Sequence, residues 1–359
     1  MILRIFAVSV VVAITGLVAG LLYGGTTALL LTAVLVVLEV SISFDNAVVN
    51  ATILQRMSRF WQQIFLTVGV LVAVFGMRLV FPLLIVGLTA SLGPIEAIEL
   101  ALAKGDPHTP GSYGYLLHEA HPAIAAFGGI FLLMLFLDFV FAERDLRWIA
   151  PVERLLGRIG GLGNLSVLVA VVALAAGGNA LAPEGKAATV LFSGLLGLGG
   201  YLAVNGLGEY FESRTESDGT DGPSGLALAT GKAAFFLFLY LEVIDASFSF
   251  DGVVGAFAIT SDPVIIAIGL GIGAFFIRSI TIYLVRTGSL ARYAYLEHGA
   301  MWAIGALAAV LIVSIAHEVP EWVTGGLGIG FIGAAMISSV RRARRRDARF
   351  WRPATGYRG

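Results

Sequence analysis

The amino-acid sequence predicts an all-α protein, a polytopic transmembrane helical bundle of about ten spans with an inverted internal repeat. The first observation is composition, because 58% of the 359 residues are hydrophobic and only 13% are charged. The second is that uncharged windows of about 20 residues recur, and each can cross a hydrocarbon core of about 30 Å. The third is an acidic motif that occurs once in each half. The apolar runs are continuous rather than alternating, which indicates helices and not a barrel.

The first predicted span begins at the N-terminus. The opening "MILRIFAVSVVVAITGLVAGLLYGG" has a basic residue near its start, as a signal peptide does. Its apolar stretch is longer than that of a typical signal peptide and further spans follow, so we expect it to be the first helix of the bundle. The predicted spans are residues 4–23, 26–54, 63–90, 123–142, 165–182, 187–210, 227–258, 263–286, 300–316 and 321–340.

Basic clusters after the second, fourth, eighth and tenth spans predict the orientation. Arginine and lysine are enriched in cytoplasmic loops, so both termini are expected in the cytoplasm. The clusters are Arg56 with Arg59; Arg144, Arg147, Arg154 and Arg158; Arg286 with Arg292; and the run that starts at Arg341. The acidic segment "EYFESRTESDGTDGPSG" after the sixth span departs from this pattern, and we expect it to be a flexible linker.

The predicted organisation is two membrane halves followed by a tail. Residues 1–186 form the first half, with its core at 26–145, and residues 187–340 form the second, with its core at 227–316. Residues 341–359 form a basic cytoplasmic tail suited to anionic lipid. The external connection at 91–121 is the longest, and it is either a lid at the interface or a solvated loop.

A polar motif lies inside the second predicted span and returns inside the seventh. The two stretches read "LEVSISFDNAVVNA" and "IDASFSFDGVVGAF". The matched pairs are Glu39 with Asp245, Ser41 with Ser247, Ser43 with Ser249, Asp45 with Asp251, and Asn46 with Gly252; farther along, Arg78 matches Arg278 and His121 matches His298. Five spans separate the motifs, so the two helices cross in opposite directions. Inverted repeats of this kind place the substrate of a transporter near the midplane.

Helical spacing gathers these polar residues on few faces. Glu39, Ser43, Asn46 and Asn50 fall on one stripe at i, i+4, i+7 and i+11, beside a stripe with Ser41 and Asp45. In the second motif the corresponding groups are Glu242, Asp245, Ser247, Ser249 and Asp251. Serine and glycine at these positions also permit a local break that frees backbone carbonyls as ligands.

The energetic cost of these acids favours a functional role. Five acidic side chains at helix centres cost about 12–18 kcal/mol before any partner is counted. Protonation, Arg78 and Arg278, or a bound cation can offset this cost. In a purely structural network, Arg78 and Arg278 would be the only positively charged partners of the five acidic side chains. Two arginines cannot neutralise five carboxylates, so an excess of negative charge remains.

The donor atoms at this site indicate which cations it suits. Carboxylate, hydroxyl and amide oxygens without any cysteine suit Mn²⁺, Mg²⁺ or Ca²⁺, and nothing in the sequence calls for an organic cofactor. His121 and His298 start helices at equivalent repeat positions, where each is either a helix-end cap or part of a gate.

These residues also carry a resemblance to a known family. "SFDNAVVNA", "SFDG" followed by "FAITSDP", "FFIRS" and "YLEHGAMWAIG" together resemble the TerC family of integral membrane proteins, which is named for tellurium resistance. The likeness covers residues 26–145 and 227–316, and the chain is most similar to a longer branch known as a domain of unknown function.

The resemblance implies a bacterial inner-membrane protein that exports a divalent cation, chiefly Mn²⁺. The implied ligands are Glu39, Asp45, Asn46, Glu242, Asp245 and Asp251. Gly252 departs from the family pattern, which has a small polar residue there.

Three functions compete at this point. The first is a secondary transporter that exports a divalent cation and resets by protonation of the same carboxylates. The second is a scaffold in a metal or tellurite stress-resistance complex, with purely structural acids. The third is an intramembrane enzyme, which the sequence disfavours because neither a GxSxG nor an HExxH motif occurs. The expected partners are the lipid bilayer, the cation and protons, and the net charge of −1 gives no indication of nucleic acid.

Overall fold

A computed structural model gives the fold of the chain. It describes all residues except 1, 161–163, 218–228, 289–292, 318 and 351–359. The side chains of 2–4, 45, 66, 88–89, 208–209, 211–217, 248–251, 254–255, 258, 321 and 345–350 also lie outside the description. The helix Ala187–Ser217 takes in the first nine residues of the predicted linker, which is therefore helical there, and the helix Glu321–Phe350 takes in the first ten of the predicted tail; the rest of both segments lies outside the description.

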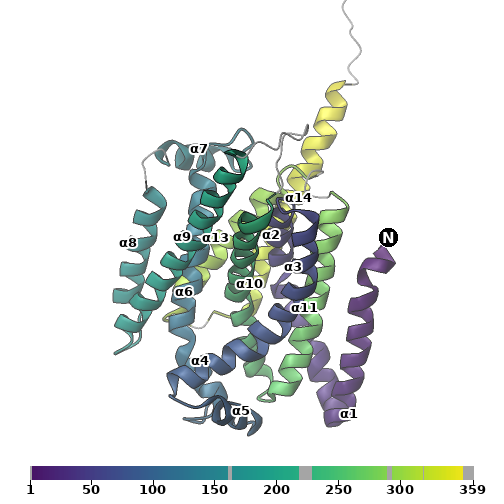
Figure 1. Cartoon of the computed structure of the whole chain (residues 1–359), viewed down its shortest axis with the longest axis vertical. Helices are drawn as coiled ribbons and strands as arrows, with labels where there is room; N and C mark the ends of the chain where they lie inside the picture. The colour runs from purple at the N-terminus through teal and green to yellow at the C-terminus, as the bar shows by residue number, and fades with distance from the viewer. Residues whose placement is uncertain (1, 161–163, 218–228, 289–292, 318, 351–359) are drawn as a thin grey trace, which may run out of the picture.

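The described part of the chain is a helical bundle without a β-strand (Figure 1). The helices of the first half are α1 (Ile2–Ile42), α2 (Phe44–Leu54), α3 (Arg59–Leu71), the π-helix η1 (Val72–Val80), α4 (Phe81–Thr89), α5 (Pro94–Leu102), α6 (Tyr113–Phe141), α7 (Ala150–Ile159) and α8 (Leu165–Ala180). Those of the second half are α9 (Ala187–Ser217), α10 (Gly231–Ile259), α11 (Pro263–Arg286), α13 (Leu296–Ser314) and α14 (Glu321–Phe350).

Seven helices in the described residues are long and apolar enough to cross a membrane, so the chain is a multi-pass membrane protein. They cover Ile5–Ile42, Arg59–Gly87, Tyr113–Phe141, Ala187–Leu207, Pro263–Arg286, Leu296–Ser314 and Trp322–Arg344. α8 is apolar but shorter, and α10 carries the second acidic motif.

α1 consists of two helical arms joined at Gly24 and Gly25, where the backbone leaves the helical region. The arms fold back on each other, because a side chain at Gly20 would lie 2.9 Å from the hydroxyl of Thr32. This bend coincides with the boundary expected between the first two spans. Gly25 has φ 69° and ψ −157°, a conformation that is essentially restricted to glycine.

Gly25→Ala is therefore expected to lower the free energy of unfolding by about 1–3 kcal/mol. Thermal unfolding of the detergent-solubilised protein measures this loss. Gly200→Ala in α9 is the matched control, because no neighbouring atom lies within 4 Å of an added Cβ, and its effect should stay within about 0.5 kcal/mol. Equal effects of the two substitutions would show that the bend does not depend on glycine.

α11 packs against both arms of α1. Ser9 in the first arm donates to the carbonyl of Phe275 at 2.8 Å and lies 2.7 Å from the hydroxyl of Ser279. Gly269 faces the second arm, where a Cβ would collide with Leu35. Contact through small residues and hydroxyl groups is typical of helices in a membrane, where apolar burial alone does not drive association.

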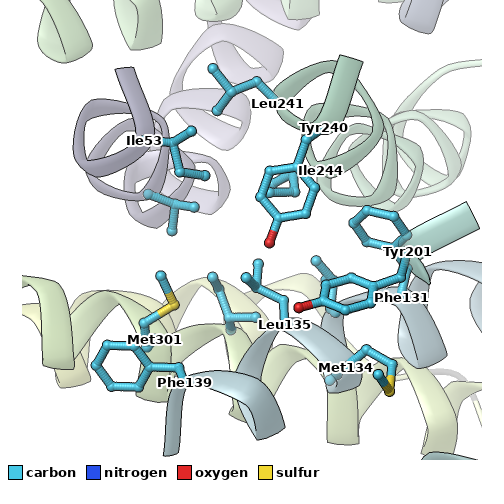
Figure 2. Packing of buried hydrophobic residues seen from close by; sticks show 14 of the residues in the cluster. Ile53, Phe131, Met134, Leu135, Phe139, Tyr201, Tyr240, Leu241, Ile244 and Met301 are labelled. Carbon is cyan, nitrogen blue, oxygen red and sulfur yellow. The ribbon is translucent and has the colours of Figure 1, made fainter. Parts of the chain in front are cut away.

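The larger hydrophobic core lies between α2, α6, α9, α10 and α13. Figure 2 shows how aromatic, aliphatic and methionine side chains from these helices interdigitate. Phe131 packs edge-on against Tyr201, with ring centroids 5.5 Å apart. This core holds α10 against the rest of the bundle and so fixes the depth of its acidic motif.

Candidate functional site

The two acidic motifs face each other across antiparallel helices. The backbone N–H of Ala229, just before α10, donates to the carbonyl of Arg56, just after α2, at 2.8 Å. The C-terminal end of α2 therefore lies beside the start of α10. Farther along, the amide of Asn46 donates to Asp245 Oδ1 at 2.6 Å, which joins the motifs directly.

Glu39 forms a buried ion pair in the first motif. Its side chain is 1% exposed and pairs with Arg78 of η1. Ser43 Oγ donates to Glu39 Oε1 at 2.9 Å, and Arg78 Nη1 donates to the carbonyl of Ala73 at 2.6 Å. The guanidinium therefore offsets the charge of this carboxylate.

The acids of the second motif are less well satisfied. Arg278 Nη2 lies 3.8 Å from Glu242 Oε1, which is too long for a hydrogen bond. The guanidinium instead donates to the carbonyl of Gly69 at 3.0 Å and stacks over the ring of Phe65 at 3.7 Å.

Several buried polar atoms in this region lack a hydrogen-bond partner among the described residues. They include both carboxylate oxygens of Glu242, Oδ2 of Asp245, both polar atoms of the Asn50 amide, and Nε of Arg78. Glu242, Asp245 and Asn50 are buried, with relative exposures of 8%, 3% and 0%. Native interiors satisfy nearly all such groups, so this concentration indicates a place for a ligand or water.

Glycines allow the close helix contacts around these acids. A Cβ on Gly69 would lie 2.7 Å from Glu242 Oε1, and one on Gly252 would lie 3.0 Å from Glu39 Oε2. A Cβ on Gly273 of α11 would collide with the side chain of Glu39. The sequence motif included Gly252 but gave no indication of the other two glycines.

The two motifs differ in backbone structure. The backbone dihedrals leave the helical region at Ser43, where φ is −91° and ψ is 12°, although Ser43 N–H still donates to the carbonyl of Glu39 at 2.9 Å, whereas α10 continues through the second motif. Arg78 lies in a π-helix and Arg278 in a regular α-helix. π-Helical segments are often found at functional sites.

The remaining predicted residues divide into three groups. Ser41 is exposed and Ser247 is buried against α6; each donates to a carbonyl of its own helix and lies apart from the cluster. The side chains of Asp45, Ser249 and Asp251 lie outside the described residues. His121 does not start a helix as predicted, because α6 begins at Tyr113; it stacks with His118 of the same helix, with ring centroids 6.4 Å apart.

No three histidine or acidic side chains within the described set lie close enough to hold a metal ion. A cavity of about 650 Å³ borders the site, but apart from Arg78 its walls are almost entirely apolar. Its lining contains no carboxylate. The carboxylates and amides of the two motifs are therefore the candidate cation ligands among the described residues.

Sequence reasoning missed a second buried polar cluster, centred on Glu153 of α7. This carboxylate accepts hydrogen bonds from the backbone N–H of Trp148 at 2.9 Å and the indole of Trp302 at 3.0 Å. His298 Nδ1 lies 3.2 Å from the same carboxylate, so this predicted gating residue ties α13 to α7. In the sequence, the feature that could have indicated this cluster was the Pro-Val-Glu start of a short amphipathic helix.

Burial raises the pKa of Glu153, but the hydrogen bond from Trp302 and the attraction to His298 outweigh it, so the pKa lies below its ordinary value. This contact therefore stabilises the fold above the ordinary carboxyl pKa, and its contribution is lost as the pH falls through the lowered value. Glu153→Gln should cost about 1–3 kcal/mol at neutral pH and should reduce the acid sensitivity of thermal unfolding. Glu297→Gln at the start of α13 is the control, because this half-exposed acid makes only solvent-accessible ion pairs with Arg144 and Arg56, and it should cost at most about 1 kcal/mol. An unaltered acid profile in Glu153→Gln would contradict this assignment.

Comparison with known proteins gives a family and no function. Neither the curated proteins nor the solved structures contain a match to this chain. One family model matches residues 44–346, which include the second acidic motif, the first motif from Phe44 onward and most of the bundle, but not Glu39. The chain therefore belongs to the family described as "Protein of unknown function (DUF475)".

Proposed function

We propose that this protein is a membrane transporter, and not an enzyme, that exports a divalent cation through a site between α2 and α10. The proposal is carried by the buried oxygens of Glu242, Asp245 and Asn50 that have no hydrogen-bond partner in the described part of the chain and that lie around the contact between the two helices. Hard divalent cations prefer carboxylate and amide oxygens, so a bound ion would satisfy these groups.

The local charge supports a cation as the missing partner. Three described carboxylates, Glu39, Glu242 and Asp245, lie among two guanidinium groups, which leaves one excess negative charge. Asp45 in α2 and Asp251 in α10 add two further acids by sequence. Bare carboxylates at this depth are costly, so protons are expected to replace the cation when it leaves. Proton coupling would make transport depend on pH.

The contacts around the motifs support an inverted repeat. In the motif alignment Asn46 corresponds to Gly252 and Asp245 to Glu39. Asn46 binds Asp245, and Gly252 lies against Glu39, so each contact is the counterpart of the other. Such reciprocity is expected of two repeats related by a two-fold axis in the membrane plane.

Ten crossings follow if the two arms of α1, together with α8 and α10, are counted as spans. The first arm alone, up to Gly24, is about 33 Å long at 1.5 Å per residue. The basic residues that cap these helices favour N-in and C-in, and the resemblance to TerC proteins favours the bacterial inner membrane and Mn²⁺ over Mg²⁺ or Ca²⁺.

Survival of cells in high external Mn²⁺ tests the proposal. Cells that lack the protein should accumulate Mn²⁺, and the parent gene should restore both survival and normal Mn²⁺ content. Asp45→Asn and Asp251→Asn should remove this protection while the protein remains in the membrane. Ser41→Ala is the matched control, because this exposed side chain only contacts its own helix. Full protection by both Asn variants would refute the transport site.

The alternative is a scaffold in a stress-resistance complex. The ion pairs of Glu39 with Arg78 and of Glu242 with Arg278 favour it, because such pairs can serve only to fix helix packing. A scaffold predicts that the purified protein binds no divalent cation and that Asn substitutions in the motifs leave the phenotype unchanged.

A further inference from the structure

α7 is too short to cross a membrane and lies across the bundle instead of along it. Its ten residues extend about 15 Å, half of the hydrocarbon thickness. Figure 1 shows α7 running across the end of the long helices, at the end from which α14 projects. A helix in this position runs parallel to the membrane surface.

One face of α7 carries large apolar side chains that the described protein covers only in part. Val152, Leu155 and Ile159 are 39%, 62% and 41% exposed, and they form one stripe at i, i+3 and i+7. Exposed leucine on a membrane-spanning helix is expected. On a helix outside the spans it requires another apolar environment.

Two arginines flank this stripe. Arg154 and Arg158 are exposed and lie one turn apart, about 110° around the helix from the apolar side chains at 100° per residue. A helix with an apolar face and a basic flank lies in a membrane interface, with the apolar side chains at the acyl boundary and the guanidinium groups at the phosphates.

Glu153 fixes the rotation of α7. Its hydrogen bonds to Trp148 and Trp302 hold the Glu153 face against α13, and Gly157 on that face is also buried. The apolar stripe must therefore point away from the bundle. This face is preset by the fold and does not require binding to order it.

We propose that α7 is an interfacial helix that binds the anionic headgroups of the adjacent leaflet. Val152, Leu155 and Ile159 enter the acyl boundary, and Arg154 and Arg158 bind lipid phosphates. The positive charge of Arg154 and Arg158 favours anionic over zwitterionic lipid. The buried Glu153 fixes the rotation of α7 about its own axis. This assignment does not depend on cation transport.

The chain contains no cysteine, so Leu155→Cys in the full chain gives a single labelling site. The labelled protein is placed in nanodiscs of phosphatidylcholine with phosphatidylglycerol, and the fluorophore is exposed to quenchers carried on either lipid or to aqueous iodide. Quenching by both lipids is expected, with phosphatidylglycerol preferred. Arg154→Gln and Arg158→Gln should each reduce that preference about fivefold, which corresponds to ~1 kcal/mol.

Arg341→Gln with Arg344→Gln in α14 is the matched control and should leave the preference at Leu155 unchanged. Three results would overturn the proposal. They are quenching by iodide alone, which places the face in water; protection from all quenchers, which indicates a protein partner or a second copy; and equal quenching by the two lipids in the parent.

Discussion

Asp245→Asn is expected to weaken the binding of Mn²⁺ to the purified protein by at least about tenfold, and up to about 100-fold, without lowering its thermal stability. The substitution replaces one carboxylate oxygen that has no hydrogen-bond partner among the described residues and keeps the oxygen that accepts from Asn46. Equilibrium dialysis with elemental analysis gives the affinity, and thermal unfolding in detergent gives the stability. A structural role for Asp245 predicts the opposite pattern, with lost stability and unchanged Mn²⁺ binding.

Asp262→Ala is the matched control for this prediction. Asp262 caps α11 by accepting from the backbone N–H of Val264 at 3.0 Å, and it binds Lys104 at 2.6 Å. Loss of the cap should cost about 0.5–2 kcal/mol and leave Mn²⁺ binding intact. The pair of variants thus separates the ligand role from the stabilising role. Reduced Mn²⁺ binding in Asp262→Ala would mean that binding follows overall stability.

The second large effect is expected at the buried pair of Glu39 and Arg78. Arg78→Met leaves a carboxylate without its counter-ion where its side chain is 1% exposed. The expected loss is about 3–5 kcal/mol of unfolding free energy. Replacing both residues, with Glu39→Leu and Arg78→Met, should recover most of this loss, because neither charge then remains buried. Unfolding in mixed micelles of detergent and denaturing detergent measures both variants.

The double variant also distinguishes two origins of the loss. If Arg78→Met and the double variant are equally unstable, the loss comes from packing around η1 and the ion pair contributes little. If Arg78→Met alone has the parent's stability, the carboxylate is not buried as described. Ser43→Ala removes only the hydrogen bond to Glu39. It should lower the free energy of unfolding by about 1 kcal/mol, whichever origin accounts for the loss in Arg78→Met.

The membrane architecture was predictable because the bilayer imposes a simple rule on sequence. Long apolar windows must be helical in lipid, and their lengths are set by the hydrocarbon thickness. Gly24 and Gly25 fell between two predicted spans, and the chain reverses there. The stripe of Glu39, Ser43, Asn46 and Asn50 was also predictable, since helical periodicity places them on one face, and all four are buried.

The features that escaped prediction depend on tertiary contacts. The π-helix around Arg78 depends on how neighbouring helices meet, and no local propensity indicates it, whereas the distorted backbone at Ser43 lies where serine was expected to permit a local break. Gly69 and Gly273 resemble ordinary helix glycines until Glu242 and Glu39 lie against them. Glu153 resembles a surface acid on a short helix, because its partners Trp302 and His298 lie far along the chain.

The binding of Mn²⁺ to the purified full chain, measured by elemental analysis after dialysis, tests the central claim most directly. The proposal predicts that the parent retains a single ion per chain, and that Asp45→Asn in α2 and Asp251→Asn in α10 each abolish retention. Both helices would then be required for the same ion. Retention of the ion by either variant at the parent's affinity, or no ion on the parent at all, would contradict a shared site between these helices.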